Sequence, residues 1–203
     1  MASKVFVIGF NKCGTTSLTQ LFRKSGHAAI HCRYQVAKGQ KANLAEQMFL
    51  NRSAGNPLLR GIDGRVMYSD MESNTQHWYL AAFTLFPELD AQYPRSRFIL
   101  NLRDRAKWLR SRTHHNNGTY MRKFLASSGL ASEDEVRALW ARQWDTHLAN
   151  VRAYFADKPG KLVEFDIAED PIEKICDFLP DLKLDPAHWG KFNANAALEE
   201  PAA

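Results

Sequence analysis

The sequence lacks long apolar runs and is poor in cysteine, with three cysteines among 203 residues. No run approaches the ~18 apolar residues of a membrane-spanning helix, and the short polar start does not resemble a signal peptide. The cysteines, Cys13, Cys32 and Cys176, include no pair with metal-ligand spacing. These absences predict a soluble cytoplasmic protein with reduced thiols, no disulfide framework and no metal site.

Internal repeats, low-complexity tracts and linkers are also missing from the sequence. Hydrophobic residues make up 45% of the chain and aromatic residues 11%, which indicates a folded globule rather than a disordered chain. A chain of this length suits one domain with a sizeable core. We therefore expect a single domain over residues 1–203, with a frayed tail at 198–203.

Positive charge is concentrated in one stretch of the chain. The formal net charge is +5, but residues 95–123 alone contain nine Lys or Arg residues against one acid, Asp104. Such a concentration is typical of a site for a multiply charged anion, whereas a solvated basic helix is the alternative interpretation. This stretch has no basic motif interleaved with aromatic residues, so we expect no nucleic-acid partner.

Apolar runs alternate with amphipathic segments along the whole chain. We expect strands at 5–8, 28–32, 66–70, 97–102 and 162–165, and helices at 15–25, 36–52, 78–93, 104–112, 132–155 and 171–179. This alternation predicts a three-layer α/β fold with a mostly parallel central sheet. Ligands of such sheets bind beyond the carboxyl ends of the strands, so the segments 9–14, 70–72 and Arg103 should converge on one cleft.

The stretch from Lys4 to Leu18 is the most informative, and it reads KVFVIGFNKCGTTSL. An apolar strand leads into a turn bounded by Gly9 and Gly14, and a helix-forming segment begins at about Thr15. This layout turns backbone N–H groups and the positive end of a helix toward an anion.

The lysine of this loop is displaced from its place in ATP-binding loops. In the form G-x-x-x-x-G-K-[ST] the lysine follows the second glycine, whereas here Thr15 holds that place and Lys12 lies inside the loop. The loop therefore predicts a phosphate-like ligand other than the β/γ pair of ATP with magnesium. A nucleotide-dependent kinase and a non-catalytic anion-binding or nucleic-acid-binding protein are the alternative functions.

A second segment reads FILNLRDRAKWLRSR, in which Arg103 leaves a strand and Ser111 follows eight residues later. Together with the loop GFNKCGTTSL, it resembles the sulfotransferases that use 3′-phosphoadenosine 5′-phosphosulfate (PAPS), whose loop pattern is [PRN]-K-x-G-T-[ST]-x-L. The resemblance extends loosely to the third expected strand and to KLVEFDI and PIEKICDFL near the end. The chain looks most similar to the short, soluble bacterial-type members.

The resemblance implies a P-loop nucleotide-binding type of fold and transfer of a sulfuryl group from PAPS to a hydroxyl or amine. The loop would hold the 5′-phosphosulfate, and Arg103 and Ser111 would hold the 3′-phosphate. The loop residues concerned are Asn11, Lys12, Cys13, Gly14, Thr15, Thr16 and Ser17. Lys12 is the expected catalytic residue, because charge on the transferring group needs stabilisation, and no metal is required.

An acceptor hydroxyl must lose its proton, so we expect a general base near the strand ends. Asp70 matches the position where soluble bacterial relatives often show Asp-x-Pro, although Met71 and Glu72 replace the usual continuation. Asp70 is our first candidate and Glu72 the second. The remaining candidates are histidines, namely His31, His77, His114 and His115.

Other conspicuous residues receive structural interpretations. We expect Cys13 to fill space in the loop, with its backbone N–H mattering more than its sulfur. Trp140 and Trp144 lie on one helical stripe, which favours the core over a cofactor contact. The segment 114–120 is expected to be a loop, and a candidate for a lid over the substrate.

Overall fold

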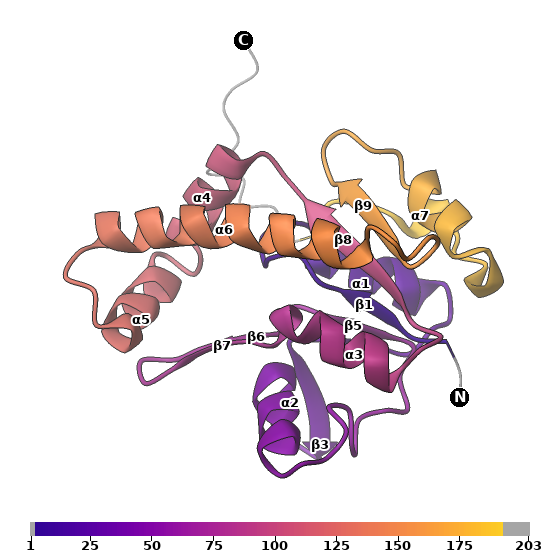
Figure 1. Ribbon diagram of the computed structural model, residues 1–203, viewed down its shortest axis with the longest axis horizontal. Coiled ribbons are helices and arrows are strands. Elements are labelled where there is room, and N and C mark those ends of the chain that lie inside the picture. Colours follow the sequence, from indigo (N-terminus) through magenta and orange to yellow (C-terminus); the bar gives the residue numbers. More distant parts are fainter. Residues whose placement is uncertain (1–2, 193–203) are drawn as a thin grey trace.

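The computed structural model describes residues 3–192 and shows an α/β fold (Figure 1). Seven strands form the main sheet in the order β4-β3-β2-β5-β1-β8-β9, and β6 and β7 form a separate hairpin. The five strands β2, β5, β1, β8 and β9 run parallel, and at one edge β3 pairs antiparallel with β2 and β4 antiparallel with β3. The strands are β1 Val5–Val7, β2 Ala29–His31, β3 Arg33–Ala37, β4 Gln40–Asn43, β5 Met67–Ser69, β6 Glu72–Asn74, β7 Tyr79–Ala81, β8 Arg97–Leu102 and β9 Leu162–Asp166.

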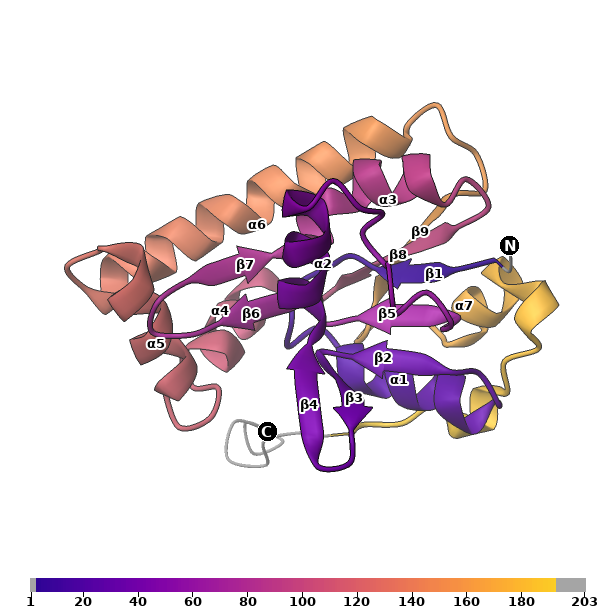
Figure 2. The ribbon, with the colours of Figure 1, turned by 90° about the horizontal axis from the view of Figure 1, so that it is seen from below.

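Helices cover both faces of this sheet, so the expected three-layer arrangement with a mostly parallel sheet is confirmed (Figures 1 and 2). The helices are α1 Thr15–Lys24, α2 Leu44–Ser53, α3 Phe86–Gln92, α4 Arg105–Thr113, α5 Thr119–Ser128, α6 Glu133–Phe155 and α7 Glu173–Phe178, with short 3-10 helices at Ala82–Leu85, Pro180–Leu182 and Pro186–His188. None of the helices within residues 3–192 has the length and apolarity to cross a bilayer.

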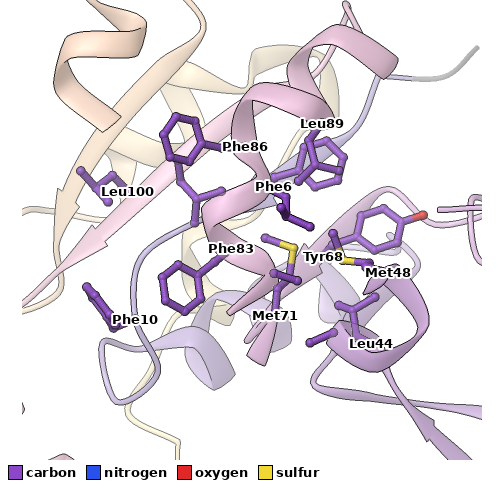
Figure 3. Close-up of a cluster of buried hydrophobic side chains, with 14 of the residues drawn as sticks. Phe6, Phe10, Leu44, Met48, Tyr68, Met71, Phe83, Phe86, Leu89 and Leu100 are labelled. Carbon is purple, nitrogen blue, oxygen red and sulfur yellow. The ribbon is translucent and has the colours of Figure 1, made fainter. Parts of the chain in front are cut away.

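One apolar cluster lies on each face of the sheet, between the strands and the helices. Successive side chains of a strand point to opposite faces, so each buried strand contributes to both clusters. Val5 and Val7 belong to the cluster beneath α1 and α7, whereas Phe6 and Ile8 belong to the larger cluster beneath α2, α3 and α6. Figure 3 shows part of the larger cluster, where aromatic and methionine side chains from several elements meet. A strand that is buried on both faces must be apolar throughout, which explains why VFVI was recognisable as a strand.

Two stretches expected to be helical begin differently in the structure. Residues 33–43 form the β3–β4 hairpin, and the helix α2 begins only at Leu44, where the side chain of Asn43 caps it by accepting from the Glu46 amide. Gly39 supplies the positive φ of 78° in the hairpin turn. Likewise, residues 79–81 form β7, and Pro87 lies in the first turn of the later helix α3.

Other expectations are confirmed. Asp104 caps α4 by accepting from the Lys107 amide, and Ser132 caps the long helix α6. Trp140 and Trp144 lie in the core. The loop expected at 114–120 ends earlier, because α5 begins at Thr119. The tail at 198–203 lies outside the described residues, and the single-domain organisation stays a prediction.

Candidate functional site

The loop after β1 is held from behind by one buried side chain, Asn101 of β8. Its Oδ1 accepts from the Gly9 amide at 2.9 Å, and its Nδ2 donates to the carbonyls of Cys13 at 2.7 Å and Phe10 at 3.2 Å. Gly9 packs against the Asn101 carbonyl so closely that a Cβ at this position would collide with it. One amide side chain therefore fixes both ends of the loop.

Two further side chains bind the carbonyls of Asn11 and Lys12. The Trp108 indole donates to the Asn11 carbonyl at 3.1 Å, and the Arg103 guanidinium donates to the Lys12 carbonyl at 3.2 Å. Since the carbonyls are directed into the protein, the N–H groups are left for another partner. Within the described residues, the backbone amides of residues 11–17 have no hydrogen-bond acceptor. Seven adjacent free donors at the start of a helix form an anion-binding nest.

The backbone of this loop adopts left-handed conformations that shape the nest. Lys12 has φ 63° and Gly14 has φ 75°. A side chain at Gly14 would be strained and would also meet Ile167 at 2.8 Å. For Lys12, a non-glycine residue, this conformation costs free energy, and such strain persists where the surroundings enforce it, often at functional sites.

The loop forms one wall of a cleft of about 830 Å³. Its other walls are residues that follow β5, β8 and β9, so the expected convergence at the carboxyl ends of the strands is observed. The sequence-predicted residues that line it are Asn11, Lys12, Gly14, Thr15, Thr16, Ser17, Asp70, Arg103 and Ser111. Trp189 and Phe192, from the segment after α7, also line the cleft, and nothing in the sequence motifs pointed to them.

Cys13 differs from the other loop residues, because its side chain is fully buried in the core. Burial raises the pKa of its thiol well above the usual range, so the thiol stays protonated and unreactive. The expectation that Cys13 contributes mainly through its backbone agrees with this placement.

Arg103 and Ser111 line the same cleft as the nest, and Arg103 also contacts the loop through the Lys12 carbonyl. Arg103 follows β8 directly, and Ser111 lies two turns into α4 with 8% of its surface exposed. Lys107, one turn before Ser111, lines the cleft as well. A guanidinium with a nearby hydroxyl and a second cation suits a second anionic group.

Lys12 is half-buried at the cleft wall. Burial lowers the pKa of its ammonium, the nearby Arg103 lowers it further, and Asp70 opposes both. The charged form of Lys12 is therefore unfavourable in the free protein. An anion that binds beside it stabilises the ammonium, because the anion replaces the lost hydration.

Asp70 follows β5 with a left-handed φ of 53° and a side chain that is 16% exposed. Burial, reinforced by the neighbouring Glu72, raises the pKa of Asp70 from 3.8 to about 7, against the opposing effect of Arg112. Its Oδ1 is buried and has no hydrogen-bond partner among the described residues. A carboxylate that lines the cleft and has a pKa close to neutrality has the properties of a general base.

The other candidates for the base differ in position. His31 lines the cleft 3.6 Å from Asp70, and burial lowers the pKa of its ring to about 4. His115 also lines the cleft, with its pKa likewise lowered to about 4 by burial and by the nearby Lys12. His77 and His114 are exposed and do not line the cleft.

Glu72, the second candidate for the base, points away from the cleft into a buried network. Its carboxylate pairs with Arg112 at 3.3 Å and accepts from the hydroxyls of Tyr79 at 3.1 Å and Tyr120 at 2.7 Å. The Arg112 guanidinium is fully buried and also donates to the Asn11 side chain of the loop at 2.9 Å. Through Asn11, this buried network supports the loop.

Sequence patterns missed both Asn101 and Arg112 as supports of the loop. Asn101 is the one polar residue inside the apolar run FILNL, and a polar residue in a buried strand signals a required hydrogen bond. Arg112 had no comparable signal, because it lies among eight other basic residues of the segment 95–123. Within residues 3–192, no cluster of three or more His, Cys, Asp or Glu side chains is arranged to hold a metal ion.

Comparisons with known proteins agree with this geometry. A family model described as "Sulfotransferase domain" matches residues 4–129, which is more than half of the chain and includes the loop, Asp70, Arg103 and Ser111. The crystal structure of a sulfotransferase from Alicyclobacillus acidocaldarius is similar in fold, with a TM-score of 0.54 and 14% identity over 98% of this chain and 88% of that chain. The search of curated proteins returned no match. This chain therefore belongs to the sulfotransferase family.

Proposed function

We propose that this protein transfers a sulfuryl group from PAPS to a hydroxyl or amine of an acceptor. The observation that carries the proposal is that the free loop amides with Lys12 line the same cleft as Arg103 and Ser111, so that two groups of anion-binding donors face one space. PAPS carries a 5′-phosphosulfate and a separate 3′-phosphate, so its two anionic ends match these two groups of donors. The cytoplasmic location stays a prediction.

The residues of the cleft divide the chemistry between them. In the transfer, the bond from sulfur to the phosphate oxygen breaks, a bond from sulfur to the acceptor oxygen forms, and the acceptor proton passes to Asp70. Lys12 and the loop amides stabilise the charge that develops on the bridging oxygen and the transferring group. The sulfuryl group carries less charge than a γ-phosphoryl group, so these donors replace the metal that ATP enzymes use.

Calorimetry with the desulfated product, 3′-phosphoadenosine 5′-phosphate (PAP), tests the proposal without knowledge of the acceptor. PAP should bind with saturation and at least tenfold more tightly than ADP, because ADP lacks the 3′-phosphate. Preference for ADP or ATP with magnesium would instead favour a kinase. Anion binding that falls steeply with salt, without saturable PAP binding, would favour the non-catalytic alternative.

Arg103→Ala should weaken PAP binding by roughly tenfold to a hundredfold, the loss expected for a charge-assisted contact to phosphate. AMP lacks the 3′-phosphate, so its affinity should change much less in the same variant. The comparison separates loss of the 3′-phosphate contact from distortion of the loop, whose Lys12 carbonyl also accepts from Arg103. An equal loss for both nucleotides would contradict the assignment of the 3′-phosphate to Arg103.

The pKa of Asp70 predicts the pH dependence of transfer. Only the ionised carboxylate accepts a proton, so kcat/KM should fall about tenfold per pH unit below about pH 7. Asp70→Asn should lower kcat by about 10²-fold or more and remove this pH dependence. Asparagine tolerates the left-handed backbone of this position, so the variant is expected to fold.

The free energy of unfolding provides an independent check on the raised pKa of Asp70. The pKa of Asp70 in the folded state lies above its ordinary value of 3.8, so the folded protein loses stability as pH rises from about 4 to about 7. Asp70→Asn removes this loss. In urea unfolding, the variant should therefore gain stability relative to the wild type at pH 8 but not at pH 4. Full transfer activity in the variant would move the role of base to His31 or His115.

A further inference from the structure

A second hollow, of about 410 Å³, lies beside the cleft and is formed by α1, β2 and the β3–β4 hairpin. Figure 2 shows α1 lying along β2 with the hairpin next to it. Thr16 and His31 belong to the walls of both the cleft and this groove. From His31 the groove follows β2 back to Ala29 and Arg65. We call this hollow the basic groove.

Four cations from four different segments converge on the basic groove. Arg23 comes from the last turn of α1, Arg33 from β3, Lys41 from β4, and Arg65 from the segment before β5. None of the described residues that line the groove is Asp or Glu. Bringing like charges together costs free energy, and that cost is relieved when an anion enters.

The cations are available to a ligand. Arg23 donates to the Ala29 carbonyl at 2.9 and 3.2 Å, which holds its guanidinium at the groove. Within the described part of the chain, Arg33, Lys41 and Arg65 have no carboxylate partner in a salt bridge. Some exposed cations elsewhere in this protein do have one, as the pair of Arg105 with Asp145 shows.

The position of the groove relative to the donor decides what enters it. Across the sheet, Arg103 follows β8 on one side of β1, whereas the basic groove lies at β2, β3 and β4 on the other side. Lys12 and Asp70 lie between the two, after β1 and β5. With the donor bound as proposed, its second phosphate lies on the side of β1 away from the groove, and the groove adjoins the side of Asp70, where the acceptor is expected.

We propose that the basic groove binds a negatively charged group of the acceptor, a phosphate, sulfate or carboxylate, and so positions its hydroxyl or amine beside Asp70. This inference rests on the proposed function and adds the class of acceptor: an anionic molecule rather than a neutral phenol, sterol or sugar. Arg33 and Lys41 are then specificity residues, which contact the acceptor away from the reacting atoms.

The experiment uses the full chain saturated with PAP, so that the nest and the Arg103 site are filled. The probes are glucose 6-phosphate and glucuronate, which distinguish a phosphate ester from a carboxylate, with neutral glucose as the matched compound. Binding is followed by NMR shifts of the backbone amides of β3 and β4. We expect saturable shifts with at least one charged sugar, at an affinity at least tenfold above that of glucose.

The variant Arg33→Gln/Lys41→Gln should weaken this binding by roughly tenfold or more while leaving PAP affinity unchanged. Lys38→Gln/Lys123→Gln is the matched control, because it removes the same charge from exposed positions outside the groove. Equal binding of glucose, an unaltered affinity in the groove variant, or an equal loss in the control overturns the inference. Failure of PAP to bind the wild type would instead contradict the proposed function.

Discussion

Lys12→Met should lower kcat for sulfuryl transfer by about 10²–10³-fold, the cost of removing one pre-positioned donor to developing charge. Methionine keeps most of the length and the apolar stem of lysine but has no ammonium. Lys12 lines the cleft beside the nest of free amides, so the loss should fall mainly on the chemical step. The measurement is the rate of PAP formation at saturating PAPS, compared with PAP affinity from calorimetry.

The reason to expect a change in kcat rather than in binding lies in the distribution of donors. Within the described residues, the seven amides of residues 11–17 are free to bind the phosphate in the variant as in the wild type. Affinity for PAP should therefore fall by a factor of ten or less. Lys123→Met, on the exposed face of α5, is the control for loss of one charge. Wild-type turnover in Lys12→Met would remove Lys12 from the mechanism.

The sequence allowed prediction of the elements whose signals are local and strong. The apolar runs that became β1 and β8 are buried on both faces, and the caps Asp104 and Ser132 satisfy amides within three residues of themselves. The β3–β4 hairpin was missed because its residues are polar and mostly exposed. Such an edge has no apolar alternation, and its pairing depends on the turn at Gly39 and on the neighbouring β2.

The candidate site divides in the same way. The placement of the loop, Arg103 and Ser111 at one cleft could be predicted, because their residues are adjacent in the chain or follow one strand. The contacts that fix the loop backbone could not be predicted. Asn101 reaches loop carbonyls about 90 residues away in the chain, and only the pairing of β8 with β1 brings them together. The burial that raises the pKa of Asp70 is likewise a property of packing.

Arg112→Met should destabilise the fold by about 3–5 kcal/mol, the cost of leaving a buried partner charge without compensation. Arg112 is fully buried and donates to Glu72 as well as to the hydroxyls of Tyr79 and Tyr120. Burial alone would lower the pKa of this guanidinium, but Glu72 and the two tyrosines outweigh it and raise the pKa. Urea unfolding measures the loss. The exposed pair of Arg105 with Asp145 is the control, since Arg105→Met should cost about 0–1 kcal/mol.

A double variant separates the charge from the packing. In Arg112→Met/Glu72→Gln the unpaired carboxylate is gone, so the double variant should be more stable than Arg112→Met alone. The Asn11 side chain loses its donor in both variants, so PAP affinity should stay reduced in both. If the double variant regained stability but not PAP affinity, Arg112 would have two separable roles, one in the core and one in holding the loop. If the double variant were the less stable of the two, packing rather than charge would account for the burial of Arg112.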